Sequence, residues 1–218
     1  MLSPHSNSAN PRLILASSSI YRQALLSRLR LPFQVVIPEI EECAYPQEAP
    51  VATAKRLASE KARVVAHGQS NCLVIGSDQV AVLDGVHIGK PGSHEKAFVQ
   101  LQQMRGQTVI FYTAVSLCDN RATTTEPGLI EQLAVVETVV TFRNLPDAEL
   151  DAYLRIEQPY DCAGSAKNEG LGIALIQSCQ SNDPTALTGL PMIALCNMLR
   201  KSGVMFFMSG DSFISSDS

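Results

Sequence analysis

Short apolar runs of strand length alternate along this chain with segments that repeat with the period of an α-helix. Residues 12–16 form the first apolar run, and a helical pattern follows at residues 22–29. Residues 33–37 predict a second strand, and residues 51–66 have a strong helical period with few breakers. Such alternation is typical of α/β proteins, in which helices cover the faces of a sheet.

A hairpin and two long strands follow in the middle of the sequence. Residues 72–75 predict a third strand, and residues 81–83 pair with residues 86–88 because Asp84-Gly85 between them is a favoured two-residue turn. The other expected elements are helices at 93–104, 146–155 and 191–201 and strands at 108–117, 130–142 and 172–176. Antiparallel pairing of the two long strands makes the expected sheet mixed. The predicted fold class is therefore α/β with a mixed, twisted sheet.

The composition indicates a protein with a substantial core. Of its 218 residues, 45% are hydrophobic and only 17% are charged, which fits one well-buried domain or two closely packed lobes. The formal net charge of −4 provides no basic surface of the kind that neutralises a nucleic-acid backbone. We therefore expect no nucleic-acid partner, and any anionic ligand must be held by well-placed local cations.

The two ends of the chain are rich in small polar residues, which is typical of frayed termini. The sequence predicts a disordered N-terminal extension at residues 1–10, one folded domain at residues 11–203 and a C-terminal tail at residues 204–218. No apolar run approaches the roughly 20 residues of a membrane span. The first residues also lack the basic start and apolar centre of a signal peptide, so no membrane partner is expected.

The 6 cysteines are scattered along the sequence, without the close pairing that zinc sites and redox dithiols use. They are expected to behave as small buried apolar residues, and the protein is expected in the reducing cytoplasm. The 4 histidines share no metal-ligand spacing, so no role in the chemistry is assigned to them.

Three consecutive serines, Ser17–Ser19, lie where the first strand passes into the first helix. Serine hydroxyls and the free N–H groups of a helix start together bind phosphate oxygens. The alternative is an ordinary helix N-cap. Arg22 favours the phosphate site, because it shares a helical stripe with Leu25 and Leu26, and a charge on an inward face needs an anionic partner.

A lysine interrupts the apolar face of the long helical segment. Lys61 lies within the stripe formed by Ala54, Leu57, Ala58, Ala62 and Val65. One interpretation is that Lys61 meets a bound anion. The alternative is that its ammonium group reaches the surface, or pairs with a carboxylate, for purely structural reasons.

Carboxylates that could hold a cation occur in two places. Glu39, Glu41 and Glu42 follow the second strand. Asp78 follows the third strand at its carboxyl end, where α/β proteins place ligand sites, although a simple turn aspartate is the alternative. Asp78 and one glutamate of the acidic run would offer oxygen ligands to a hard cation such as Mg²⁺. Lys90, after the hairpin, could bring another positive charge to the same cleft.

The segment at residues 160–172 contains three glycines around Lys167 and Glu169. This pattern predicts a loop whose backbone closely approaches another group and which leads into the strand at residues 172–176. The loop is not a P-loop, because it lacks the GxxxxGK[ST] pattern.

Several segments, in order along residues 12–201, resemble the Maf family of nucleotide pyrophosphatases. They are SSSIYR, the Glu run, LASEKA, GSDQV, GKP, RGQT, DCAGSAKNEGLG and GLPMIAL. GSDQV and SAKNEG are similar to the 7-methyl-GTP subgroup, whereas the sister subgroup for dTTP and UTP has Thr after the Asp and Gln in place of Glu169. Ile20 departs from the family, which usually has Pro there; the change removes no functional group but is expected to loosen the serine loop.

The resemblance implies an elongated α/β fold with two lobes around a nucleotide cleft, similar to inosine triphosphate pyrophosphatases. It also implies a homodimer, a divalent metal cation (Mg²⁺ or Mn²⁺) as cofactor and a small-molecule nucleotide substrate. The implied activity is hydrolysis of 7-methyl-GTP to 7-methyl-GMP and pyrophosphate.

Residue roles follow from the same resemblance, position by position. The catalytic positions are Asp78, as proton acceptor, with Lys61 and Lys90. The metal positions are Glu42 and Asp78. The substrate-binding positions are Ser17, Tyr21, Arg22, Gln79 and Glu169. Among them, Tyr21, Gln79 and Glu169 are linked to the choice of substrate.

Glu169 is expected to accept hydrogen bonds from the N1–H and amino groups of methylated guanine, because a carboxylate is an acceptor only. Tyr21 is the candidate for stacking on the cationic ring, and Gln79 would adjust the pocket. The alternative is that Glu169 only pairs with Lys167 in an exposed loop, where the pair would be worth little.

Two other functions fit the same residues. The first is the sister activity on dTTP, UTP or other non-standard nucleotides, which needs the same phosphate-binding residues and differs only around the base. The second is a nucleotide-binding regulator, such as a septum-formation inhibitor, with little turnover. The presence of Asp78, Lys61 and Lys90 disfavours the regulator, since a pure binder has no need of a proton acceptor.

Overall fold

The structure of the chain is a computed structural model that describes residues 10–121 and 129–207. Most of the predicted N-terminal extension, residues 1–9, and of the predicted tail, residues 208–218, lies outside the described residues. No helix in the described part of the chain combines the length and the apolar character that a membrane crossing requires.

The described ends of the chain are attached to the body of the protein. Asn10 donates a hydrogen bond from Nδ2 to the carbonyl oxygen of Met205, at 3.1 Å, and accepts one at Oδ1 from the backbone N–H of Met205, at 3.2 Å. Val204 is buried, and Phe206 packs against the same apolar cluster. Val204 and Phe206 therefore contribute to the core.

The elements alternate as the sequence pattern predicts. The strands are β1 (Arg12–Ala16), β2 (Phe33–Val36), β3 (Cys72–Leu83), β4 (Val86–Ile88), β5 (Thr108–Asp119), β6 (Ile130–Phe142) and β7 (Ile176–Ser181). The α-helices are α1 (Ile20–Ser27), α2 (Pro50–His67), α3 (His94–Met104), α4 (Asp147–Glu157) and α5 (Met192–Lys201). Three short 3₁₀ helices are η1 (Ala163–Ser165), η2 (Leu171–Leu175) and η3 (Ala186–Thr188).

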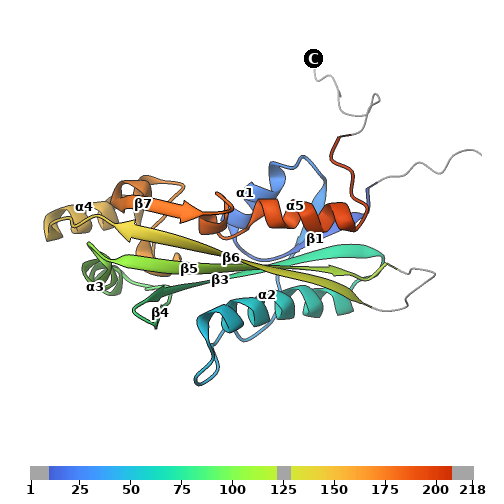
Figure 1. Ribbon diagram of the computed structural model, residues 1–218, viewed down its shortest axis with the longest axis horizontal. Coiled ribbons are helices and arrows are strands. Elements are labelled where there is room, and N and C mark those ends of the chain that lie inside the picture. The colour runs from blue at the N-terminus through green and yellow to red at the C-terminus, as the bar shows by residue number, and fades with distance from the viewer. Residues whose placement is uncertain (1–9, 122–128, 208–218) are drawn as a thin grey trace, which may run out of the picture.

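The seven strands of the described residues form one sheet, in the order β2-β1-β3-β5-β6-β7, with β4 paired to β3 (Figure 1). β1 is parallel to β2 and β3, whereas β5, β6 and β7 continue the sheet in antiparallel pairs. Asp84 and Gly85 both have positive φ angles, +49° and +80°, and join β3 to β4 as the expected hairpin. The predictions of a mixed sheet and of antiparallel β5 and β6 are confirmed. The likeness to inosine triphosphate pyrophosphatases stays a prediction.

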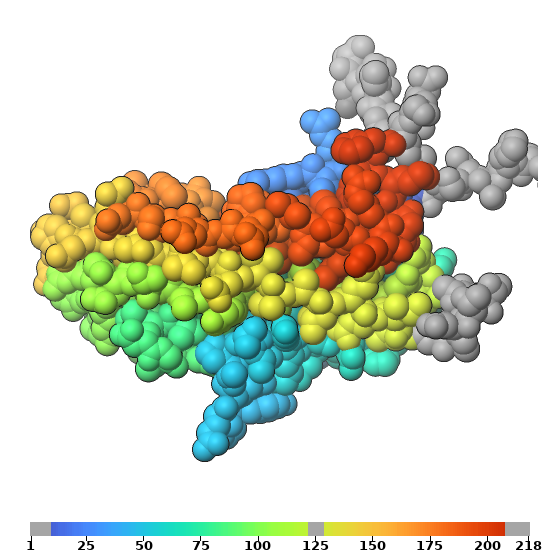
Figure 2. All heavy atoms as spheres, in the orientation of Figure 1, coloured from blue at the N-terminus to red at the C-terminus, as the bar shows by residue number. Residues whose placement is uncertain are grey.

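Helices cover both faces of this sheet (Figure 1). Successive side chains of a strand point to opposite faces, so Val74 and Val80 of β3 pack against α2, while Leu73 and Ile75 pack toward α1 and α5. A second core, which includes Ala81, lies between the far end of the sheet and helices α3 and α4. The molecule is elongated along the long strands that join the two cores (Figure 2).

Helix α2 lies unusually close to β3. Pro50 occupies the first turn, and the buried stripe includes Lys61, as the periodicity predicts. A Cβ atom at Gly76 would lie 2.3 Å from the carbonyl oxygen of Ala58 and 2.7 Å from the backbone nitrogen of Ala62. Only glycine permits this approach, which brings the Lys61 side chain to β3.

The separate strands predicted at residues 72–75 and 81–83 are one strand. β3 pairs with β5 without interruption from Leu73 to Val82, so Asp78 lies inside a strand and not at its carboxyl end. The polar segment Ser77–Gln79 interrupts the apolar run in the sequence and gives the false appearance of a strand end. Backbone pairing with β5 holds the strand together across this segment.

The strand predicted at residues 172–176 is also wrong. Leu171–Leu175 forms the 3₁₀ helix η2, and β7 begins at Ile176. β7 is an edge strand, and residues 177–181 are exposed. Because neither face of those residues is buried, their sequence carries no alternating apolar pattern.

Candidate active site

A cleft lies along one edge of β3, between the end of β1 and the end of β4. β1 pairs with β3 as far as Gly76, and β4 pairs with it from Ala81 onward. No described strand pairs with residues 77–80 on that edge, so side chains from both faces of β3 reach the same space. The cleft has a volume of about 710 Å³. Its lining includes every residue predicted for the site: Ser17, Tyr21, Arg22, Glu42, Lys61, Asp78, Gln79, Lys90 and Glu169.

The serine loop serves both as a helix cap and as a wall of the cleft. The Oγ atom of Ser19 accepts a hydrogen bond from the backbone N–H of Arg22 at 3.3 Å, so the ordinary N-cap interpretation holds for Ser19. Ser17 is buried, and its Oγ accepts a hydrogen bond from Nη1 of Arg22 at 3.4 Å. Nε of Arg22 donates to the carbonyl oxygen of Gly189 at 2.8 Å. In the described structure these partners are neutral, which leaves the charge of Arg22 available to an anion.

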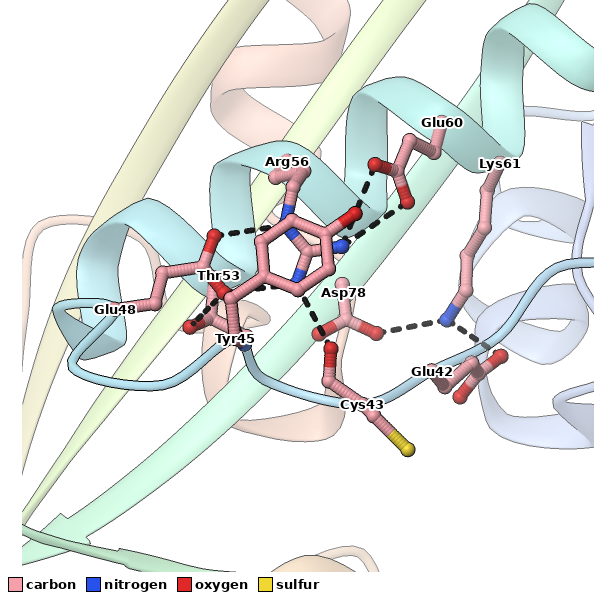
Figure 3. A network of polar contacts seen from close by, with 9 residues as sticks. All are labelled: Glu42, Cys43, Tyr45, Glu48, Thr53, Arg56, Glu60, Lys61 and Asp78. Atoms are coloured by element: carbon pink, nitrogen blue, oxygen red, sulfur yellow. Dashed lines mark hydrogen bonds and ion pairs between the residues drawn. The ribbon is translucent and has the colours of Figure 1, made fainter.

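Lys61 joins two carboxylates from different segments. Its Nζ atom lies 2.7 Å from Oδ1 of Asp78 on β3 and 2.9 Å from Oε1 of Glu42, in the segment between β2 and α2 (Figure 3). The side chain of Lys61 is only 4% exposed, and that of Asp78 is 10% exposed. The anomaly of a lysine in an apolar stripe thus has a direct explanation: Lys61 faces a buried carboxylate at the cleft.

The charges at this side of the cleft alter one another's protonation. Burial raises the pKa of Asp78, and the positive charges of Lys61 and Arg22 offset only part of that rise. Burial also acts to raise the pKa of Glu42, but the hydrogen bond to Lys61 and the charges of Lys61, Lys90 and Arg22 outweigh it, so that pKa is lowered. Burial lowers the pKa of Arg22. We refer to Arg22, Lys61, Lys90, Glu42 and Asp78 as the cationic cluster.

The segment that carries Glu42 is fastened to α2 by an arginine. Arg56 forms an ion pair with Glu48, Nε to Oε1, at 2.7 Å and donates from Nη2 to the carbonyl oxygen of Cys43 at 2.9 Å (Figure 3). Its guanidinium also stacks on the ring of Tyr45, 3.9 Å from the ring centre. These contacts hold the residue next to Glu42, so they place that carboxylate beside Lys61.

The two carboxylates fit a hard divalent cation. Glu42 and Asp78 already converge on one positive charge, the ammonium group of Lys61, from two separate segments. The described residues contain no group of three or more His, Cys, Asp or Glu side chains that could hold a metal ion. A metal ion at Glu42 and Asp78 would therefore take its other oxygen ligands from phosphate and water, as Mg²⁺ commonly does.

Gln79 presents a defined atom to the cleft. Its Nε2 lies 2.9 Å from Oγ1 of Thr113, 3.0 Å from the carbonyl oxygen of Ala186 and 3.0 Å from that of Leu187. With three acceptors around the nitrogen, the opposite amide orientation would place oxygen against oxygen, so Oε1 is the atom left for a ligand. Gln79 is therefore a hydrogen-bond acceptor at this wall.

The segment before α5 holds several of these groups, and the sequence patterns did not reveal its role. The carbonyl oxygen of Gly189 accepts hydrogen bonds from Arg22 and from Oγ of Ser77, at 2.8 and 2.9 Å. Gly189 has a φ angle of +106°, which favours glycine. Thr188 and Asn168 also line the cleft and are joined by a hydrogen bond of 3.0 Å. The only signal for this segment was GLPMIAL, one of the segments that carry the resemblance to the family.

The other side of the cleft is acidic. Asp161 and Glu169 both line it, and they raise the pKa of Tyr21 further after burial has already raised it. Burial raises the pKa of Glu169 itself, and the charges of Glu157 and Asp161 add to that rise. Asp161 and Glu169 are named the acidic pair. The backbone near them is close-packed as predicted, since a Cβ atom at Gly172 would lie 2.5 Å from the carbonyl oxygen of Lys167.

The alternative in which Lys167 pairs with Glu169 is wrong. Nζ of Lys167 lies 2.6 Å from Oε1 of Glu157, at the end of α4. Within the described residues, Glu169 forms no ion pair. Its carboxylate is thus available at the cleft.

The fold and the cleft together define an α/β protein with three cationic side chains, Arg22, Lys61 and Lys90, lining a cleft at the edge of its sheet. Residues 12–202 match the family described as Maf-like protein, and the chain belongs to that family.

Close relatives cover almost the whole chain. The 7-methyl-GTP pyrophosphatase of Cupriavidus pinatubonensis is 57% identical over 197 residues, which are 90% of this chain and 96% of the relative. The protein of the same name from Burkholderia thailandensis is 57% identical over 206 residues, 93% of each chain. That from Ralstonia nicotianae is 57% identical over 190 residues, 87% of this chain and 95% of the relative.

Proposed function

We propose that this chain is a nucleoside triphosphate pyrophosphatase that hydrolyses 7-methyl-GTP to 7-methyl-GMP and pyrophosphate. The observation that carries the proposal is the division of charge within one cleft. The cationic cluster suits a triphosphate, and the acidic pair suits a purine ring that methylation at N7 has made positive. A nucleotide with a neutral base would gain from only one of these two sides. The names of the relatives support the same substrate.

On the phosphate side, three cations have different tasks. Lys61 is held by Asp78 and Glu42, so it orients these carboxylates and offsets their charge. Arg22 and Lys90 bind phosphate oxygens, and Ser17 adds a buried hydroxyl beside Arg22. Stabilisation of charge on the leaving pyrophosphate by these groups is the main contribution to the rate, as is usual in phosphoryl transfer.

A divalent metal cation, Mg²⁺ or Mn²⁺, is part of the proposal. Glu42 and Asp78 would hold it, because they are hard oxygen donors that already share one cation. When bound, such an ion offsets negative charge on the triphosphate. A single ammonium group between two carboxylates cannot also neutralise an incoming triphosphate.

Asp78 is the proposed proton acceptor. Burial raises its pKa, which makes its carboxylate a better base than an exposed aspartate, and the neighbouring ammonium group of Lys61 favours the ionised form. As water attacks the phosphorus atom of the α-phosphate, Asp78 takes a proton from the water. The bond between the α- and β-phosphates breaks, and pyrophosphate leaves with the electrons of that bond. No covalent intermediate with the protein is needed.

On the base side, Glu169 accepts hydrogen bonds from the N1–H and amino groups of the methylated guanine. Tyr21 lines the same cleft as Glu169 and offers an aromatic face to the cationic ring. Gln79 adds the acceptor Oε1 between the two sides of the cleft. An arrangement composed of acceptors favours an edge with adjacent donors and disfavours the acceptor-rich edges of pyrimidines.

Two further properties belong to the proposal. The six cysteines, all within the described residues, are free, which agrees with a reducing cytoplasmic location. The protein is proposed to be a homodimer that acts on a small-molecule nucleotide and not on nucleic acid. Light scattering on the purified protein tests the oligomeric state.

The deciding experiment is pyrophosphate release by the purified chain on 7-methyl-GTP, GTP, dTTP and UTP, each with Mg²⁺ and with Mn²⁺. The highest kcat/KM is expected for 7-methyl-GTP, and excess chelator is expected to abolish turnover. Preference for dTTP or UTP would assign the sister activity instead. Tight nucleotide binding without pyrophosphate release would assign the regulatory role.

A further inference from the structure

Lys167 belongs to the same loop as Glu169, but its side chain pairs with a residue of α4. Its Nζ atom is 2.6 Å from Oε1 of Glu157, and it lies 6.0 Å from the centre of the Tyr21 ring. Neither Lys167 nor Glu157, both in the described part of the chain, lines the cleft. The positive charge closest in sequence to Glu169 is therefore held outside the cleft by a different carboxylate.

We propose that Glu157 is a positioning residue for substrate choice, which acts by binding Lys167 and so keeping Glu169 unpaired for the base. This inference rests on the proposed function, because it concerns how that site selects a cationic base. Glu157 does not touch the substrate. Glu157 acts indirectly, because it keeps the negative charge of Glu169 available to the base.

The geometry favours Glu157 as the partner of Lys167. The side chain of Glu157 is 13% exposed, and its Oε2 accepts a second hydrogen bond, from the backbone N–H of Leu171, at 2.8 Å. The carboxylate is thus held by both sides of the loop. A Cβ atom at Gly170 would lie 2.9 Å from it, so glycine at that position leaves the space the carboxylate needs.

Tyr153 strengthens this arrangement. Its buried hydroxyl accepts a hydrogen bond from the backbone N–H of Lys167 and donates one to the carbonyl oxygen of Ser165, both at 3.1 Å. The backbone of Lys167 is therefore fixed independently of its side chain. Removal of the carboxylate of Glu157 would release the ammonium group without removing this backbone anchor.

A released Lys167 would turn to Glu169. The two residues are two positions apart, and the charge of Lys167 already acts to lower the pKa of Glu169. The lysine stem is long and flexible, so its ammonium group can follow the nearest free carboxylate. Pairing would neutralise Glu169 and block the oxygens that the base needs. Glu157 prevents this pairing, because its own carboxylate binds the ammonium group of Lys167.

The test uses Glu157→Gln, Lys167→Met and the double variant. Glu157→Gln is expected to lower kcat/KM for 7-methyl-GTP by about tenfold or more while sparing UTP. The reason is that Lys167 would then pair with Glu169, and the base would lose this charged hydrogen-bond acceptor. Lys167→Met is the matched control and keeps the preference, because no lysine is left to pair with Glu169. The double variant is expected to recover the preference that Glu157→Gln loses.

Recovery in the double variant separates the proposal from a merely structural role. If Glu157 only caps the loop, the double variant will select no better than Glu157→Gln, and the proposal is overturned. An unchanged preference in Glu157→Gln overturns it as well.

A second readout needs no turnover. The carboxyl carbon of Glu169 can be titrated by NMR in ¹³C-labelled wild type and in the same variants. Loss of the charge of Glu157 lowers the midpoint in both Glu157→Gln and the double variant, but it is expected to fall further in Glu157→Gln, because Lys167 then pairs with the carboxylate of Glu169. Equal midpoints in Glu157→Gln and in the double variant would overturn the proposal. If the wild type releases no pyrophosphate from 7-methyl-GTP, the proposed function fails, and this titration still decides the contacts of Lys167.

Discussion

The two sides of the cleft are built in different ways. The cationic cluster comes mostly from regular elements, with Arg22 on α1, Lys61 on α2 and Asp78 on β3. The acidic pair comes from the irregular segment between α4 and β7. Rigid elements hold the groups that act on phosphate, where small displacements are costly. A loop holds the groups that select the base, so selection can change with little effect on the core.

Glycine has a matching role on each side. Gly76 lets α2 lie against β3 and so brings Lys61 to Asp78. Gly172 lets the loop fold back onto the backbone of Lys167 and so holds Glu169 at the cleft. If the two sides do separate work, damage to the first should affect every nucleotide, and damage to the second should affect selection.

The largest effect is expected from Asp78→Asn. This change keeps the shape of the side chain but removes the proton acceptor and one metal ligand, so turnover should fall on the order of 10²-fold or more. The loss should be equal for 7-methyl-GTP and UTP, because Asp78 acts on the phosphates that both share. Steady-state kinetics on both nucleotides provides the check. A near-normal rate would transfer the role of base to another group, with Glu42 the first candidate.

A smaller effect is expected from Gly76→Ala, with Gly172→Ala as its counterpart. A Cβ atom at Gly76 would overlap the backbone of α2, which should cost about 1–3 kcal/mol of folding free energy and lower turnover of every nucleotide. Gly172→Ala would disturb only the loop, so it should lower the preference for 7-methyl-GTP. Urea unfolding of the two variants measures the change in folding free energy, and kcat/KM for 7-methyl-GTP and UTP measures the change in preference. If Gly76→Ala and Gly172→Ala changed the preference between nucleotides equally, the two sides of the cleft would not have separate roles.

The smallest effect on the preference between nucleotides is expected from a change in pH. Burial raises the pKa of Asp78, and burial raises that of Glu169. Asp78 must be ionised to accept a proton, so kcat/KM for every nucleotide falls as pH drops through its raised pKa. Protonation of Glu169 weakens the contact with a cationic base only, so 7-methyl-GTP should lose more than UTP. A ratio of the two kcat/KM values that stays constant from neutral to acidic pH would oppose this expectation.

The two sides also differ in how far the sequence predicted them. Lys61 was identifiable because helical periodicity puts it in an apolar stripe, and the structure confirms that burial. Its partner Glu42 lies far from it in sequence, in a segment without periodicity, so no local pattern could show that the two meet. The sequence indicated the acidic run as a whole, and only the resemblance to a family singled out Glu42 among its three glutamates.

The irregular side was harder to predict. The pattern of glycines indicated a close-packed loop at residues 160–172, and Gly172 confirms it. The partner of Lys167 could not be predicted, because Glu157 lies on another element and a surface carboxylate has no distinguishing pattern. The strand after the loop was misplaced, since β7 is exposed and has no apolar alternation. Buried elements leave periodic traces in a sequence, whereas exposed strands and long-range ion pairs do not.

The central claim is that one side of the cleft acts on phosphate while the other selects the base, and Glu169→Gln tests it most directly. The measurement is kcat/KM for 7-methyl-GTP and for UTP, in this variant and in the wild type. Loss of the charged acceptor should lower the first by roughly 1.5–3 kcal/mol, which is about tenfold or more, and leave the second unchanged. Equal losses on both nucleotides, or no loss on either, would contradict the account.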